Sequence, residues 1–110
     1  MPIYQTCPTV YRQTDIFTTV GVGQTTETGL TGVSKFTIQV SLIGQALFWS
    51  TDLEISLDGI NFDRVLTHNN DFGANTMIYS NLETPSLYFR VCCTSLSPAS
   101  SIQTTVTGSN

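Results

Sequence analysis

The fold of this chain is decided by residues 53–62, which read LEISLDGINF. Apolar and polar residues alternate up to Asp58-Gly59, and alternation of this period is typical of a strand with one buried face. An Asp-Gly pair between two such runs is a strong hairpin signal, because glycine accepts the positive φ that tight hairpin turns need. Residues 87–91, LYFRV, repeat the alternation. The sequence therefore predicts an all-β domain with a structural turn at Asp58 and Gly59.

Further strand patterns are spread along the rest of the chain. Apolar residues alternate with polar ones over 36–42 and 49–57, and residues 60–66 read as the partner strand of the hairpin. Shorter patterns predict strands over 15–20, 76–80, 87–94 and 102–106. Apolar residues nowhere recur at helical spacing over three turns. About seven or eight strands with regular turns predict an antiparallel β-sandwich with little helix, of jelly-roll or immunoglobulin-like topology.

Strand alternation also predicts which side chains form the core between the two sheets. The predicted core consists of Phe36, Ile38, Val40, Trp49, Leu53, Ile55, Leu57, Phe62, Phe89, Val91 and Cys93. With 110 residues the chain is one domain, long enough to build a core without disulfides or metals.

The weakest pattern lies in residues 1–33. Two prolines near the N-terminus disfavour a central strand there, and residues 21–32 are a connection rich in glycine and threonine. We therefore expect residues 34–110 to form the sandwich core of the single domain. Residues 1–33 would supply an edge strand, or an arm that reaches a neighbouring subunit. The candidate interface residues in this region are Tyr4, Tyr11, Arg12 and Phe17.

The composition excludes several classes of partner. The net charge is −4, and only four residues, Arg12, Lys35, Arg64 and Arg90, are basic, too few for a stripe that follows a phosphate backbone. The apolar runs are too short to span a bilayer, and the N-terminus lacks the basic start and apolar block of a secretory signal. We expect neither a nucleic acid nor a membrane as a partner.

The polar residues are mostly hydroxyls and amides rather than charges. The chain holds 18 Thr and 11 Ser but one Lys. Because Lys, Glu and Asp are depleted at protein–protein interfaces, this composition suits a subunit that covers much of its surface with neighbours. The alternative is a Thr-rich β-sandwich that is simply built in this way.

No residues assemble into a catalytic motif. His68 is the single histidine, and a lone histidine in a predicted loop is typically a solvated polar residue. A general base needs a positioned partner and a nucleophile, and zinc needs more ligands than this. We therefore expect no enzyme activity and no cofactor.

The three cysteines do not form a disulfide framework. Cys92 and Cys93 are adjacent on a predicted strand and so point to opposite faces, with Cys93 inside and Cys92 beside Arg90. The odd count fits a reducing compartment, and a bridge from Cys7 to Cys92 is the alternative. On its polar face, Arg90 is expected to pair with Asp52 or Glu54.

Two binding sites are weaker candidates. In the loop over residues 68–75, Asp71 together with Asn69, Asn70 and Asn75 offers oxygen ligands for calcium, although the spacing is not that of an EF-hand and such residues are common in turns. Exposed aromatics would form a platform for sugars. The candidates are Tyr4, Tyr11, Phe48, Phe72 and Tyr79.

Several segments between Ser34 and Gly108 resemble small β-sandwich proteins of tailed bacteriophages. They are KFTIQV (35–40), EISLDGINF (54–62), YFRV (88–91) after a proline, TSL (94–96) and IQTTVT (102–107). The hairpin followed by Tyr-x-Arg-Val is the most telling part, and Phe62 stands where tryptophan is frequent. Similar hairpins occur in discoidin-like and carbohydrate-binding sandwiches. The resemblance implies capsid decoration subunits or neck and tail accessories, and it carries over no catalytic residues.

The leading hypothesis is therefore a non-enzymatic structural protein of the virion, assembled in the host cytoplasm. It would act as a decoration or cement subunit that stabilises a tailed phage particle, with capsid or other virion proteins as partners and a homo-oligomeric or symmetric assembly. The alternatives are a carbohydrate-binding module for host attachment and a neck or tail accessory protein.

Overall fold

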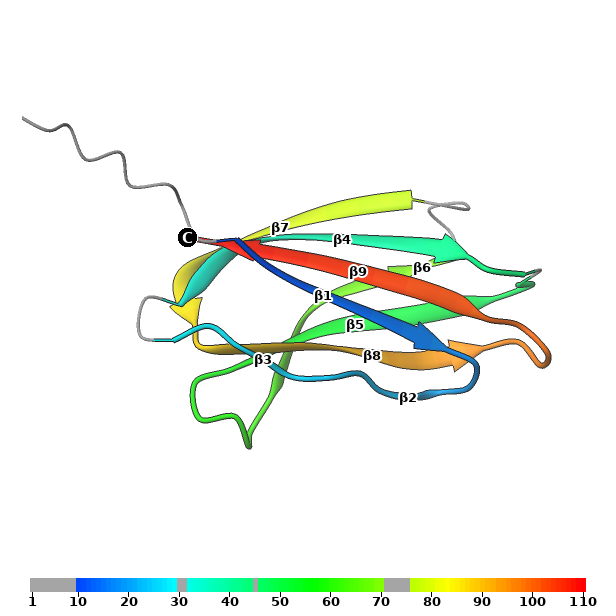
Figure 1. Cartoon of the computed structure of the whole chain (residues 1–110), viewed down its shortest axis with the longest axis horizontal. Coiled ribbons are helices and arrows are strands. Elements are labelled where there is room, and N and C mark those ends of the chain that lie inside the picture. The colour runs from blue at the N-terminus through cyan, green and yellow to red at the C-terminus, as the bar shows by residue number, and fades with distance from the viewer. Residues whose placement is uncertain (1–9, 30–31, 45, 71–75) are drawn as a thin grey trace, which may run out of the picture.

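The computed structural model describes residues 10–29, 32–44, 46–70 and 76–110. These residues form β-strands and no α-helix, as predicted (Figure 1). The strands are β1 (Val10–Phe17), β2 (Gly21–Val22), β3 (Thr26–Glu27), β4 (Val33–Leu42), β5 (Trp49–Ser56), β6 (Asp63–Asn69), β7 (Thr76–Ser86), β8 (Tyr88–Leu96) and β9 (Ile102–Ser109).

The strands form two antiparallel sheets that face each other. Sheet A has the order β1-β9-β4-β7, and sheet B has the order β2-β8-β5-β6, with β3 also paired to β8. Apart from β2–β3 and the β5–β6 hairpin, each strand is followed by one in the opposite sheet. With β2 and β3 counted as one interrupted strand, this is the order of an eight-stranded jelly roll. The β-sandwich prediction is confirmed, and the strand order selects the jelly roll over the immunoglobulin-like topology.

Residues 10–17 form an edge strand of sheet A. β1 pairs with β9 along its whole length, from Val10 opposite Ser109 to Phe17 opposite Ile102. The strand predicted over residues 15–20 thus begins and ends earlier, because the chain leaves sheet A after Phe17 and crosses to sheet B. Of the two interpretations of residues 1–33, the edge strand is the one that the described part of this region adopts.

The connection between β5 and β6 is longer than the tight turn that Asp58-Gly59 predicts. β5 ends at Ser56 and β6 begins at Asp63. Gly59 has the expected positive φ, 77°. The Asp58 carboxylate organises the loop, because its Oδ1 accepts hydrogen bonds from the backbone N–H groups of Ile60 and Asn61, both at 2.8 Å.

Two strands extend beyond their predicted ends. β7 runs from Thr76 to Ser86 rather than stopping at residue 80, because its pairing with β4 resumes at Val33 opposite Ser86 after an irregularity. β6 runs to Asn69, so that His68 lies in a strand opposite Thr51 rather than in a loop.

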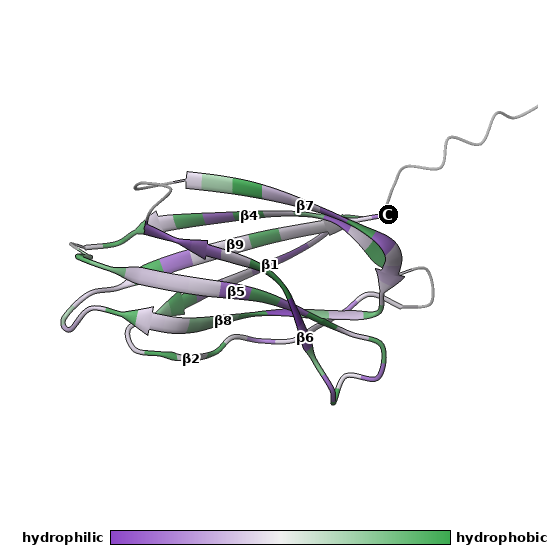
Figure 2. Ribbon diagram, turned by 180° about the vertical axis from the view of Figure 1, so that it is seen from behind, coloured by the Kyte–Doolittle hydropathy of each residue, from purple (hydrophilic) through white to green (hydrophobic). Residues whose placement is uncertain are grey.

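Most predicted core residues lie between the sheets. Phe36, Ile38, Val40, Trp49, Leu53, Phe89, Val91 and Cys93 are buried there, joined by Phe17, Val33, Ile102 and Val106. The rings of Phe36 and Phe89 meet edge to face with centroids 5.4 Å apart and so join sheet A to sheet B. Hydropathy alternates along the strands that carry these residues (Figure 2).

Three predicted core residues differ from the prediction. Leu57 is 65% exposed, because β5 ends one residue before it and the alternation stops with the strand. Phe62 is half-buried outside the core, with its ring 3.8 Å from the guanidinium carbon of Arg90. Ile55 is half-buried and packs against the core cluster.

His68 is fully buried, which contradicts the prediction of a solvated loop residue. Its ring meets Trp49 edge to face, with centroids 5.1 Å apart. Burial lowers the pKa of His68 from its usual value of 6.5, because the charged imidazolium loses its hydration. The strand pairing of β6 with β5 decides this placement.

Candidate functional site

The outer side of sheet A is a regular surface that carries few charges. On each strand of this sheet, alternate residues point away from the core, and the strand registers align them in rows. These residues are called the interaction face below. They are Val10, Arg12, Thr14 and Ile16 of β1, Lys35, Thr37, Gln39 and Ser41 of β4, Met77, Tyr79, Asn81 and Glu83 of β7, and Gln103, Thr105, Thr107 and Ser109 of β9.

Hydroxyl and amide groups fill the middle of the interaction face. One row runs from Thr14 through Thr105 to Gln39 and Met77, and the two threonine hydroxyls lie 3.4 Å apart. Each threonine hydroxyl is one donor with acceptor capacity, so the face can exchange hydrogen bonds with a partner of either polarity.

Exposed apolar residues lie on the two edge strands of the interaction face. Ile16 on β1 is 64% exposed, and Met77 and Tyr79 on β7 are 61% and 58% exposed. Burying them against a partner would be favourable by about 25 cal/mol for each Å² of apolar surface removed from water.

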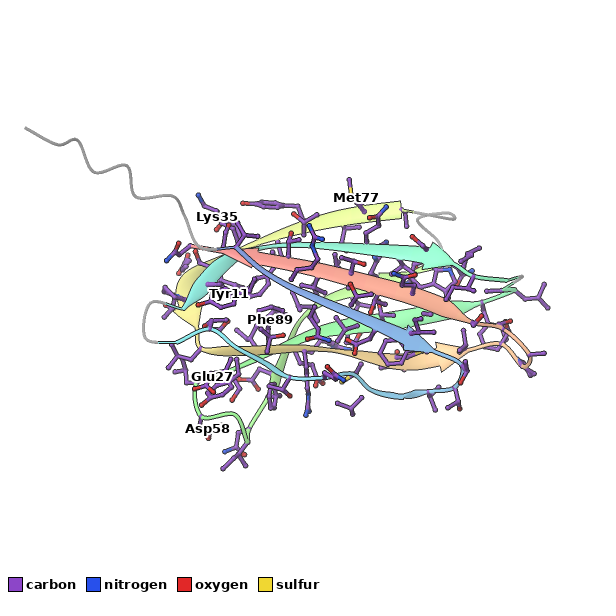
Figure 3. The ribbon with its side chains drawn as sticks, viewed as in Figure 1. Tyr11, Glu27, Lys35, Asp58, Met77 and Phe89 are labelled. Carbon is purple, nitrogen blue, oxygen red and sulfur yellow. The ribbon has the colours of Figure 1, made fainter. Side chains whose placement is uncertain are left out.

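The charged residues of the interaction face are Arg12, Lys35 and Glu83, so that two of its three charges are positive. The chain as a whole has a net charge of −4. In Figure 3, Lys35 and Met77 project from one side of the sandwich, whereas Glu27 and Asp58 lie on the opposite side. The interaction face therefore carries a small excess of positive charge on an acidic protein.

The outer side of sheet B has a different chemistry, because it carries carboxylates, two of which have hydrogen-bond partners on neighbouring strands. Arg90 Nε donates to Glu54 Oε1 at 2.8 Å, which is one of the two pairings predicted for Arg90, and Cys92 Sγ lies 3.1 Å from the same oxygen. Burial raises the pKa of Glu54, but the hydrogen bonds from Cys92 and Arg90 outweigh it, so that the net shift is downward. Thr67 Oγ1 donates to Asp52 Oδ1 at 2.9 Å.

A pocket of about 350 Å³ opens beside the β5–β6 loop. It is lined by Ile55, Ser56, Leu57, Asp58, Asn61, Asp63, Thr84, Pro85 and Ser86. The hydrogen bonds from the backbone of Asn61 and Ile60 hold the pKa of Asp58 well below its usual value. The Asp58 carboxylate therefore makes its hydrogen bonds within its own loop. None of these described lining residues is aromatic, so they offer no stacking surface for a sugar.

The four candidate interface residues differ in their burial and in their place in the structure. Arg12 is exposed on the interaction face, and its role in an interface stays a prediction. Phe17 is only 6% exposed and belongs to the core, which contradicts its assignment to an interface. Tyr11 is half-buried and packs against the core. Its Oη donates a hydrogen bond to the Thr28 carbonyl at 2.7 Å and so links β1 to the segment that follows β3. Tyr4 lies outside the described residues.

The exposed aromatics do not share one strand or loop. Phe48 precedes β5 in the β4–β5 connection, and Tyr79 lies on β7 opposite Thr37. Phe72 lies outside the described residues. The structure brings together no aromatic platform among the residues that it describes.

Two of the four calcium ligands predicted in the loop over residues 68–75, Asp71 and Asn75, lie outside the described residues. Asn70 Oδ1 accepts a hydrogen bond from the Trp49 N–H at 3.4 Å. The described residues contain no group of three His, Cys, Asp or Glu side chains that could hold a metal ion.

The predicted interface residues did not include Met77 and Ile16, which the structure shows to be exposed. The sequence does indicate the exposure of Met77. Residues 76–79 read TMIY, with apolar residues at both odd and even positions of the strand. A strand in a two-layer sandwich buries one parity, so the other must face outward. Ile78 is the half-buried one that packs against the core.

No helix in the described residues is long and apolar enough to cross a membrane. No family model matches the sequence, and a search of curated proteins finds no significant match. Among solved structures, the SPBc2 prophage-derived protein YomS is similar over 99% of this chain and 100% of its own, with a TM-score of 0.70 and 10% sequence identity. This likeness shows a shared fold. A structure of PirA matches at a TM-score of 0.46 with 10% identity over 96% of each chain, and no argument depends on it.

Proposed function

We propose that this protein is a non-enzymatic structural component of a tailed phage, a decoration subunit that binds the capsid surface and its neighbouring subunits. The observation that carries the proposal is the interaction face, which is regular, rich in hydroxyls, poor in charge and bordered by exposed apolar residues. The sequence resemblance to small phage β-sandwich proteins supports it. So does the shared fold with a protein of prophage origin.

The chemistry of the interaction face suits association without a large electrostatic cost. Hydroxyls and amides are less costly to remove from water than unpaired charges, and they can be satisfied by hydrogen bonds across an interface. Arg12 and Lys35 favour an acidic partner surface and orient its approach. An interface of ordinary size covers about 800 Å² on each partner. Simultaneous contacts with several capsid subunits would raise the apparent affinity further.

A neck or tail position is the nearest alternative, since the same face would serve there against a different arrangement of partners. A carbohydrate-binding module is the second. Jelly rolls occur in both viral capsid proteins and lectins, so the fold does not choose between them. The scattered exposed aromatics and the absence of aromatic rings among the described pocket residues favour the protein-binding function over the sugar-binding one.

The test is binding of the purified protein to empty capsids of its phage, measured by analytical ultracentrifugation or mass photometry. We expect saturable binding at a fixed copy number. Arg12→Glu on the interaction face should weaken binding about tenfold, equivalent to about 1.4 kcal/mol. Arg64→Glu is the matched control, because Arg64 is an exposed arginine on β6 in sheet B and undergoes the same charge reversal.

Three outcomes would redirect the proposal. Binding to purified necks or tails but not to capsids would select the accessory role. Recognition of sugars on a glycan array, with no affinity for any particle, would select the carbohydrate-binding module. Equal losses from Arg12→Glu and Arg64→Glu would show that the interaction face is not the contact surface.

A further inference from the structure

The described strand edges of the sandwich differ in how well they are protected from pairing with another chain. An exposed edge presents unpaired N–H and C=O groups, and proteins usually blunt it with charges, short strands or covering segments. On β1, Asp15 points inward and its Oδ1 accepts the Gln24 N–H at 3.1 Å, while Gln13 Oε1 accepts from Thr26 Oγ1 at 3.1 Å. Gln24 and Thr26 are therefore held against the inner side of β1, whose edge also carries the charged residues Arg12 and Asp15.

The two edges of sheet B are also blunted. On one side the edge is made of β2 and β3, each of two residues. On the other side β6 begins with Asp63 and Arg64, and its pairing with β5 shifts register between Leu53 and Glu54. Short strands, charged residues and register irregularities all oppose the addition of a further strand.

Over residues 76–82, β7 lacks these protections, whereas Glu83, Pro85 and a register irregularity follow in the last part of the strand. It is 11 residues long, forms the edge of sheet A and, among the described strands, pairs with β4 alone (Figure 1). Its register against β4 is regular from Lys35 opposite Asn81 to Val40 opposite Thr76. Residues 76–82, TMIYSNL, carry no charge and no proline. No described strand covers the other edge of this stretch, where a strand from outside can pair.

We propose that β7 pairs with β7 of a second copy, antiparallel and about a twofold axis at Ile78, which joins the two A sheets into one continuous sheet. A twofold contact requires a surface that is complementary to itself. An uncharged stretch meets this requirement, because no like charges are brought opposite each other. With the axis at Ile78, residues 76–80 of one copy pair with the same residues of the other in the opposite direction.

The side chains favour a register centred on Ile78. This register places Met77 of each copy opposite Tyr79 of the other, so the two most exposed apolar residues of β7 cover each other twice. A thioether against an aromatic ring is a favourable contact. On the inner side, Ile78 meets Ile78 of the second copy beside the core that it already contacts. A register centred on Tyr79 would instead leave Met77 opposite Asn81.

The dimer does not depend on the proposed function, although it shares Met77 and Tyr79 with the interaction face, because it joins the copies through the edge of β7 and leaves the middle of that face open. It has a structural consequence for that face, since two copies present their interaction faces on the same side of one joined sheet. Arg12 and Lys35 of both copies then lie on one surface.

Sedimentation equilibrium of the purified protein tests the proposal. The wild type is expected to sediment as a dimer of the 12.0 kDa chain. The double variant Met77→Lys/Tyr79→Lys puts lysines opposite lysines twice and should sediment as a monomer. Ile16→Lys is the matched control, because it adds a lysine to the other edge strand of sheet A, at a residue of similar exposure, and should leave the dimer intact.

The register is tested by Met77→Glu/Tyr79→Lys. With Ile78 at the axis, the introduced glutamate of each copy faces the introduced lysine of the other, and the dimer should persist. In a register centred on Tyr79, the two introduced lysines would face each other and the dimer would be lost. Circular dichroism checks that each variant keeps its strands. A monomeric wild type, or a dimer that survives Met77→Lys/Tyr79→Lys, overturns the proposal whatever the capsid-binding assay shows.

Discussion

At the scale of single residues, His68 shows how strand pairing creates a group sensitive to pH. The side chain is fully buried against Trp49, and burial holds its pKa below 6.5. It is the one histidine of the chain. Its protonation is therefore the main side-chain titration expected between the ranges of the carboxylates and of the thiols.

The first prediction concerns the free energy of unfolding near neutral pH. Since the pKa of His68 is lower in the folded state than in the unfolded chain, the unfolded state takes up the proton first. The free energy of unfolding should therefore be highest above about pH 6.5, where His68 is neutral in both states. It should decrease as the pH falls through the pKa of His68 in the folded protein. His68→Phe should flatten this dependence. Urea titrations of both proteins at a series of pH values measure it.

The pKa shifts of the carboxyl groups affect the free energy of unfolding at a lower pH than the pKa shift of His68. The pKa values of Asp58 and Glu54 are lowered from 3.8 and 4.5, so their contributions are lost only at more acid pH. An unchanged slope in His68→Phe between about pH 5 and 6.5 would contradict the assignment to His68.

The second prediction concerns the two described cysteines. Burial raises the pKa of Cys92 to about 12, with the neighbouring Glu54 adding to the effect, and burial also raises the pKa of Cys93. Because the thiolate is the reactive form, neither should react with iodoacetamide at about pH 8 in the folded protein. A Cys7→Ser variant isolates these two thiols, and mass spectrometry before and after denaturation counts the labels. Rapid labelling of the native protein would refute the prediction.

At the scale of elements, the β5–β6 hairpin depends on a loop that is tied to sheet B. Asp58 accepts hydrogen bonds from Ser56, Ile60 and Asn61 within the loop. The backbone at Gly59 passes close to the ring of Tyr88 on β8. The loop is therefore fixed both by its own hydrogen bonds and by a contact across the sheet.

The third prediction is that Gly59→Ala destabilises the protein by about 1–2 kcal/mol. The residue has φ 77°, and a Cβ at this position would lie 3.1 Å from the Tyr88 ring. Gly21→Ala is the matched control, since a Cβ there meets nothing within 4 Å and its φ is not positive. Thermal unfolding of the two variants should differ clearly. Equal melting temperatures would show that the Gly59 conformation is not required.

At the scale of the whole molecule, stability comes from packing two sheets over one apolar layer. Phe89 of sheet B and Phe36 of sheet A are both fully buried and in edge-to-face contact (Figure 3 labels Phe89). Removing either ring would leave a cavity between the sheets that the rigid strands cannot close.

The fourth prediction compares a core residue with one that was wrongly expected to be in the core. Phe89→Ala should reduce the free energy of unfolding by about 3–5 kcal/mol. Leu57→Ala removes an apolar side chain that is 65% exposed and should change it by no more than about 0.5 kcal/mol. Chemical denaturation of both variants tests the difference. A large loss in Leu57→Ala would mean that this leucine is covered in solution.

The fold class and most of the core could be predicted from the sequence, because period-two alternation depends only on neighbouring residues. The strands around Phe36, Leu53 and Phe89 follow from it, and so does the positive φ at Gly59. The error at Leu57 arose where alternation continued beyond the end of a strand, a limit that pairing with β6 and β8 determines.

Local sequence by itself determined an all-β chain, its inward-facing residues and the low charge of its polar faces. Only the tertiary structure decided the jelly-roll strand order, the burial of Phe17 and His68, and the gathering of Thr14, Thr105 and Gln39 into one face. The physical reason is that a residue's periodicity fixes which way it points relative to its own strand. Which strands lie beside it, and which edges stay open, depends on pairings between segments far apart in the chain.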